Sequence, residues 1–175
     1  MIIRLVNGLA LLSTGLLAGA FGYGAVNVVA TFNAVPLDVR LTFHSALMHM
    51  NGPVIQTTMA AAALTSLTLA ALMQRRQRLM AAGAGMLVVI SFLITRLGNV
   101  PINGQIKIWA VNGPPPGYPE LLRQWENYNI ARTLTALAAF VLIIWLTQLA
   151  TKQERRHDRG SASATEPALH PNRSE

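Results

Sequence analysis

The sequence predicts an all-α fold in which four transmembrane helices form a bundle. Only 12% of the 175 residues are charged, about half of the ~25% found in soluble domains, while 52% are hydrophobic. None of the four long apolar runs shows the charged face of a soluble amphipathic helix. Each is close to the ~20 residues that cross a hydrocarbon core, and they cover Leu5–Thr31, Val54–Met73, Leu79–Thr95 and Ile130–Leu149.

The distribution of basic residues predicts that both termini are cytoplasmic. Nine of the 14 Lys and Arg residues lie in segments that the positive-inside rule assigns to the cytoplasm. These are Arg4, the loop 74–78, the segment 152–159 and Arg173. Topology thus accounts for most of the net charge of +7, and no nucleic-acid partner is expected. The predicted location is a multi-pass position in the lipid bilayer, which in a bacterium is the inner membrane.

Two parts of the chain are distinguished by composition. Residues 1–152 form the predicted membrane domain, and the polar tail 153–175, which contains Gly, Ser and Pro, is expected to be disordered. Small residues at Ala18–Ala20 resemble a signal-peptide cleavage site. The apolar run continues beyond them, which favours an uncleaved span. The absence of cysteine excludes disulfides and thiolate metal sites within the chain.

Glycines recur every seven residues in the first run, at Gly8, Gly15 and Gly22. Helices in lipid associate where small residues let their backbones approach closely. The spacing predicts a packing face, against another helix of the chain or in an oligomer. The alternative is that glycine is simply frequent in membrane helices.

The segments between the runs on the non-cytoplasmic side differ in character. After Pro36, apolar residues at helical spacing predict a helix over Leu37–Met50 that joins the second span with a bend near Asn51–Pro53. The longest predicted loop covers residues 98–124. Its segment 112–119, "NGPPPGYP", is incompatible with a helix, and we expect it to form a lid or rim.

Polar and aromatic residues gather on this predicted outer side from three separate regions of the chain. Polar groups near lipid need partners or water, so their concentration at one membrane face predicts a site there. The cytoplasmic side offers mostly Arg and Gln in loops. The outer residues are His44, His49, Asn51, Arg96, Asn99, Asn103, Trp109, Trp125, Asn127, Asn129 and Arg132.

The start of the fourth run carries the clearest geometry. Trp125, Asn129 and Arg132 are spaced by four and three residues, which places them on one face of a helix. This spacing favours an inward polar wall. The alternative is an interfacial belt in which Trp lies at the headgroups and Arg extends toward water.

A second polar wall is predicted from "TRLGNVPIN", residues 95–103. Pro101 lacks a backbone donor and disfavours helix at Val100. Asn99 and Asn103 would then satisfy the freed backbone groups or line a polar cavity. The alternative is that these Asn side chains only cap a helix end.

His44 and His49 are candidates for proton transfer. Five residues on an ideal helix correspond to about 140° of rotation, so one metal ion bound by both is disfavoured. Acidic residues are sparse nearby, and no metal site is predicted. The sequence requires no cofactor, although haem or a metal held through His44 or His49 is an alternative, as is a purely structural role.

The motif "NVPIN", the following Trp109 and the pattern "WxxxNxxR" resemble the anthrone oxygenase-like integral membrane protein family. The resemblance covers about residues 5–150 and implies a small four-helix membrane protein. Most members are labelled only as a domain of unknown function, while some fungal members are implicated in oxidising an anthrone to an anthraquinone. The matching positions are Asn99, Pro101, Asn103, Trp109, Trp125, Asn129 and Arg132.

Two functions follow as hypotheses. In the first, the protein is an oxygenase or oxidoreductase for a lipophilic aromatic. His44 or His49 would be the general base, Arg132 would stabilise the anion, and Trp109 and Trp125 would stack on the rings. Asn99, Asn103 and Asn129 would hold the substrate oxygens. In the second, the protein is a non-catalytic membrane binding protein or a helper subunit of a membrane complex. A transporter is disfavoured, since no charged residue lies mid-membrane.

Overall fold

The computed structural model describes residues 1–165, with side chains described through Leu149, and all regular secondary structure within that range is helical. Four continuous helical rods are long and apolar enough to cross a membrane, which confirms the predicted all-α, four-helix architecture. The elements are α1 (Ile2–Tyr23), the π-helical turn η1 (Gly24–Val28), α2 (Val29–Ala34), α3 (Leu37–Leu72), α4 (Arg75–Ile94), the π-helical turn η2 (Thr95–Asn99), α5 (Val100–Asn112) and α6 (Tyr118–Thr165).

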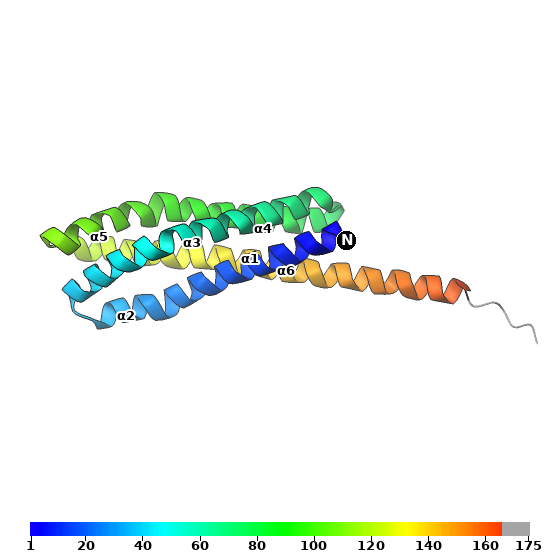
Figure 1. Ribbon diagram of the computed structural model, residues 1–175, viewed down its shortest axis with the longest axis horizontal. Coiled ribbons are helices and arrows are strands. Elements are labelled where there is room, and N and C mark those ends of the chain that lie inside the picture. The colour runs from blue at the N-terminus through cyan, green and yellow to red at the C-terminus, as the bar shows by residue number, and fades with distance from the viewer. Residues whose placement is uncertain (166–175) are drawn as a thin grey trace, which may run out of the picture.

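The rods lie side by side along one long axis (Figure 1). α1 packs against α3 and α6, and α4 packs against the same two helices, so each rod has two neighbours. The N-terminus, the connection between α3 and α4 and the continuing end of α6 lie at one end of the bundle. The connections α2–α3 and α5–α6 lie at the opposite end, which we call the distal end.

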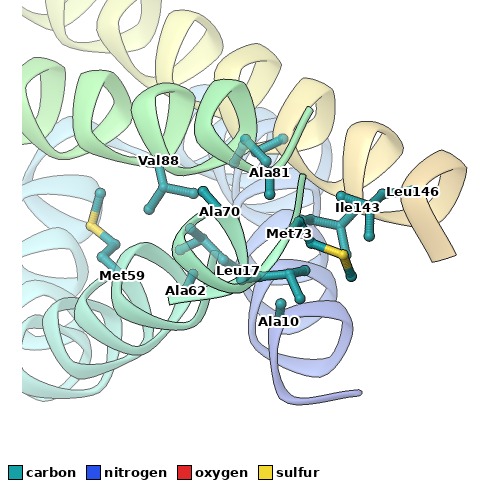
Figure 2. Close-up of a cluster of buried hydrophobic side chains, with 14 of the residues drawn as sticks. Ala10, Leu17, Met59, Ala62, Ala70, Met73, Ala81, Val88, Ile143 and Leu146 are labelled. Atoms are coloured by element: carbon teal, nitrogen blue, oxygen red, sulfur yellow. The ribbon is translucent and has the colours of Figure 1, made fainter. Parts of the chain in front are cut away.

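The half of the bundle near the N-terminus contains an apolar cluster that we call the terminal core. Seven of its fifteen buried residues are alanine, and Figure 2 shows that they come from all four rods. Small side chains let these helices approach closely without strain. Gly15 illustrates this, because a Cβ there would lie 3.1 Å from the Phe140 ring of α6. One residue of the predicted glycine face is therefore used within the chain, whereas a Cβ at Gly8 or Gly22 would meet no atom within 4 Å.

The distal half contains a second cluster, the distal core, with a larger share of aromatic residues. It is formed by Phe32, Leu41, Ile102, Ile106, Trp109, Leu122 and Trp125. These residues belong to α2, α3, α5 and α6, so all four rods contribute again.

The prediction of a long loop over residues 98–124 is wrong. α5 runs to Asn112 and α6 begins at Tyr118, so only residues 113–117 connect them. Gly113, with φ of 79°, takes a left-handed conformation that glycine adopts without a steric penalty. The prolines then stop the helix, and Pro119 fits the first turn of α6, where its missing N–H has no helical partner to lose.

The two internal prolines do not interrupt the rods. The predicted helix over Leu37–Met50 is confirmed, and α3 continues through Pro53 to Leu72. The expectation that Pro101 breaks the helix at Val100 is wrong, because α5 begins at Val100 directly after η2. The wider π turn and the early position of Pro101 in α5 accommodate its missing N–H.

α6 extends beyond the bundle to Thr165. The predicted disorder of the tail concerns residues 153–175, of which 166–175 lie outside the described residues. It stays a prediction.

Candidate functional site

Three polar side chains from three rods meet beside the distal core. Asn103 Oδ1 on α5 lies 2.7 Å from Trp125 Nε1 on α6 and 3.1 Å from His44 Nε2 on α3. Two of the three residues are almost fully buried, with His44 0% and Trp125 2% exposed. We call this set the histidine cluster. It joins residues that are 59 and 22 positions apart in the chain.

The geometry of the histidine cluster fixes the tautomer of His44. The indole N–H of Trp125 only donates, so the Asn103 atom that it contacts must be the carboxamide oxygen. That oxygen only accepts, so the His44 contact requires a proton on Nε2. In the neutral ring Nδ1 then carries the free lone pair, and it is buried without a hydrogen-bond partner among the described residues. The cluster thus presents a neutral imidazole with an unengaged basic nitrogen.

Aromatic rings enclose this imidazole. Phe32 of α2 stacks on His44 with ring centroids 4.7 Å apart and planes 12° from parallel. Trp125 meets it edge-on at 4.5 Å. The His44 ring therefore contacts two aromatic side chains on adjacent sides, since the Phe32 and Trp125 ring centroids are themselves 6.2 Å apart. Such surroundings would also suit a flat aromatic molecule.

An ion pair lies one helical turn before His44. Arg40 Nη2 is 2.9 Å from Glu126 Oε1 on α6, and Arg40 Nη1 donates to Asn33 Oδ1 at the end of α2. The guanidinium lies 5.8 Å from the Phe32 ring centroid. These contacts tie α2, α3 and α6 together at the distal end, directly beside the ring that stacks on His44.

Asn99, one helical turn before Asn103, connects η2 to α6. Its Nδ2 donates to the backbone carbonyl of Trp125 at 3.1 Å, and the residue is fully buried. It makes no cap hydrogen bond, so the interpretation of Asn99 as a helix cap is wrong. Neighbouring Gly98 packs against the Tyr128 ring, which a Cβ would approach to 2.6 Å. η2 and α6 are therefore in direct contact at this level.

A second polar group lies further along α6. Arg132 donates to Asn129 Oδ1 from Nε at 3.0 Å and from an Nη at 2.6 Å. Its guanidinium lies 4.4 Å from the Phe21 ring centroid, a close cation–π contact. Asn129 is 1% exposed, and its Nδ2 is buried without a partner in the described part of the chain. Both Arg132 and Arg40 lie within electrostatic reach of His44.

The distal end has two open hollows of about 420 Å³ each. The first lies between α3 and α5 and includes Trp109, which packs in the distal core. The second lies where α2, α3 and α6 begin or end, and Phe32, Arg40 and Glu126 are among the residues that line it. Phe32 therefore borders this hollow and His44 at the same time.

The structure brings together most of the residues that the sequence singled out. His44, Asn103 and Trp125 meet at one point, and Asn99 contacts the backbone of Trp125. Asn129 and Arg132 follow along α6. The burial of Trp125 and Asn129 fits an inward wall and not an interfacial belt.

His49 is different, because it is exposed and lies outside the histidine cluster. Among residues 1–149, whose side chains the structure describes, no three His, Asp or Glu side chains gather closely enough to hold a metal ion.

Four participating residues were not predicted as site residues: Phe21, Phe32, Arg40 and Glu126. Two of them carried a usable signal, because Arg40 precedes His44 by one helical turn and Glu126 follows Trp125. The phenylalanines carried none, since an aromatic residue in an apolar run is indistinguishable from ordinary core.

Comparison with known proteins identifies a family for the chain. No curated protein and no solved structure matches the chain. The model of the anthrone oxygenase family matches residues 39–142, more than half of the chain, and this range includes His44, Asn103, Trp125 and Arg132. The chain belongs to the anthrone oxygenase family.

Proposed function

We propose that the protein is a membrane oxygenase that converts the activated CH₂ group of a lipophilic anthrone-type aromatic into a carbonyl. The observation that carries this proposal is the free Nδ1 of a neutral His44, whose other nitrogen is held by Asn103. A general base needs a free lone pair and a fixed orientation. The histidine cluster supplies both, among aromatic rings that match a planar substrate.

The reaction needs only dioxygen as co-reactant. His44 Nδ1 takes a proton from the CH₂ group, which leaves a carbanion whose charge is delocalised onto the ring oxygens. The carbanion adds O₂ to give a peroxide, and the His44 imidazolium returns the proton to it. Loss of the second C–H proton and cleavage of the O–O bond then release water. The sum is CH₂ + O₂ → C=O + H₂O.

Arg132 supplies positive charge for the anionic intermediate. Asn129 holds the guanidinium through two hydrogen bonds, so its position is fixed before the substrate binds. A preoriented charge in apolar surroundings stabilises a developing anion more strongly than water does. Asn99 Oδ1 and Asn129 Nδ2 lack partners among the described side chains. Asn129 Nδ2 is placed to donate to a substrate carbonyl oxygen, and Asn99 Oδ1 is placed to accept from a substrate hydroxyl.

Substrate access requires the movement of an aromatic side chain. His44 is completely buried. Phe32 stacks on the His44 ring and lines the second of the two distal hollows, so the Phe32 ring separates that hollow from the imidazole. A planar substrate would take the place of the Phe32 ring and keep the stacking contact with the imidazole. The aromatic enclosure thus favours flat ligands over branched aliphatic ones.

The first prediction tests the base. Purified protein in detergent is mixed with a hydroxylated anthrone, and oxygen consumption and anthraquinone absorbance are followed after subtraction of the uncatalysed rate. His44→Gln should lower the catalysed rate by about 10²–10⁴, the usual contribution of a general base. His49→Gln, which changes an exposed histidine five residues away, is the matched control and should retain activity. Equal losses in both variants, or no catalysed rate in the unchanged protein, would refute the proposal.

The complete burial of His44 favours a second candidate, a non-catalytic role in which the polar side chains hold the helices together. Substitution of Asn129 and Arg132 separates the two functions. Loss of oxygen uptake with normal membrane levels and normal thermal unfolding supports the oxygenase. Loss of the protein from the membrane supports the structural role.

A further inference from the structure

The second distal hollow contains a buried cation that the proposed reaction does not use. Arg40 lines this hollow, yet its side chain is only 9% exposed. Keeping a guanidinium away from water is costly unless its donors are engaged. The hydrogen-bond partners of this guanidinium therefore indicate which kind of ligand the hollow can bind.

Two of the three nitrogens of the Arg40 guanidinium donate a hydrogen bond within the described part of the chain, and the third does not. Nη1 donates to Asn33, and Nη2 donates to Glu126 Oε1 at 2.9 Å. Nε is buried and has no partner among the described residues. Nε and Nη2 form the edge to which a carboxylate binds with two parallel hydrogen bonds. Glu126 occupies only one of these two donors, so the edge remains available for a better-fitting anion.

Glu126 lies at the boundary between this edge and the hollow. Its side chain is 21% exposed at the hollow, so it keeps access to water when another anion takes its place. The exchange of one carboxylate for another leaves the buried charge of Arg40 balanced. Arg123 also lines the hollow, but its charge is already paired with Glu120, so Arg40 is the cation on which anion binding depends.

The remaining walls of the hollow are suited to an aromatic ring. Phe32 lies under the Arg40 guanidinium, and Tyr118 lines the hollow from the start of α6. A ring bound here would touch Phe32, which also stacks on His44. An acid group on Arg40 would therefore hold an aromatic ligand next to the histidine cluster.

We propose that this hollow binds the ionised acid group of a planar aromatic ligand, with Arg40 as the anion partner in exchange for Glu126. As the substrate class of the oxygenase, an acidic aromatic, this inference rests on the proposed function. As a binding site it stands alone, since its test requires no turnover.

The test measures binding of anthracene-2-carboxylate to the full-length protein in a non-ionic, phosphate-free detergent. Quenching of tryptophan fluorescence gives the affinity, and the methyl ester of the same probe is the neutral comparison. The unchanged protein should bind the acid more tightly than the ester. Glu126→Gln removes the competing carboxylate and should tighten acid binding about tenfold, with ester binding unchanged. Asp38→Asn removes the same charge from an exposed site at the distal end and is the matched control.

Arg40→Gln should abolish the preference for the acid, and Arg40→Lys, which lacks the two-donor edge, should restore only part of it. Gel filtration and thermal unfolding identify variants that fail to fold, and a gain of affinity in Glu126→Gln cannot arise from misfolding. Weaker or unchanged acid binding in Glu126→Gln overturns the proposal. Arg40-dependent binding of phosphatidylglycerol without binding of the aromatic acid also overturns it, and assigns the hollow to a lipid phosphate.

Discussion

The terminal core and the distal core satisfy their buried polar groups in different ways. Beside the terminal core, Ser13 and Thr14 donate to carbonyls of their own helix, Leu9 O at 2.8 Å and Ala10 O at 2.6 Å. Of these two, only Ser13 also meets a hydroxyl of another rod, Thr65 Oγ1 at 3.0 Å. Beside the distal core, the partners come from other rods. His44 and Trp125 share Asn103, and Asn99 reaches the backbone of α6.

This difference means that polar groups in the terminal half leave helix packing largely unconstrained, whereas those in the distal half fix the relative positions of the rods. A hydroxyl that bonds within its own turn needs no particular neighbour, so the terminal core is free to be mostly alanine and leucine. Amide and ring nitrogens that bond across rods require their partners at fixed positions. The distal half therefore specifies how α3, α5 and α6 are placed relative to one another, as a binding site requires.

The largest effect should come from removal of the shared acceptor. Asn103→Ala leaves the N–H groups of His44 and Trp125 without a partner in buried surroundings. Each unsatisfied donor costs about 1–3 kcal/mol, so the free energy of unfolding should fall by about 3 kcal/mol. Oxygen uptake should be lost as well, because the His44 tautomer is no longer fixed. Denaturant titration in mixed micelles measures the first effect.

Asn127→Ala is the control for Asn103→Ala, because Asn127 is exposed on α6. Its unfolding free energy should stay within about 0.5 kcal/mol of the unchanged protein. Similar losses in both variants would mean that Asn103 has no special place in the distal half.

A smaller effect is expected from Gly98→Ala in η2. The added Cβ would lie 2.6 Å from Tyr128 Cγ, an atom too close to the α6 backbone to swing away. Overpacking of this kind costs about 1–3 kcal/mol, and displacement of η2 would also move Asn99 and Asn103. Gly8→Ala, where a Cβ meets nothing within 4 Å, should leave stability almost unchanged. Normal stability and oxygen uptake in Gly98→Ala would show that η2 and α6 tolerate separation.

The sequence predicted the terminal half more completely than the distal half, for a physical reason. Hydropathy treats each residue as if it faced lipid, so the runs were expected to end where polar residues begin. In the structure the third rod ends at Asn112, well beyond the predicted end at Thr95. The start of α3 at Leu37 was anticipated only by the helical spacing after Pro36, not by hydropathy. Asn103 lies in the extension of the third rod and contacts His44 of α3 and Trp125 of α6 instead of ending the helix.

Periodicity found the face of α6 but not its partners. The spacing of Trp125, Asn129 and Arg132 sufficed to predict an inward wall, because spacing within one helix is fixed by helix geometry. Helix geometry does not determine which residues of two different helices pair with each other. The Arg40–Glu126 contact joins residues 86 positions apart, and nothing local in either segment indicates the other.

The smallest effect should come from the terminal half, in Thr14→Val. Thr14 is fully buried, but its hydroxyl bonds only to carbonyls of α1, which the helix backbone already engages. Valine keeps nearly the same shape and leaves no new group without a partner. The unfolding free energy should therefore change by less than about 0.5 kcal/mol, and oxygen uptake should persist.

The comparison variant for Thr14→Val is Thr14→Asn. Its larger polar side chain finds no partner among the small apolar residues of the terminal core, so it should clearly destabilise the protein. A loss of more than about 2 kcal/mol in the valine variant would mean that local hydroxyl bonds matter as much as bonds between rods, and the contrast between the two halves would not hold.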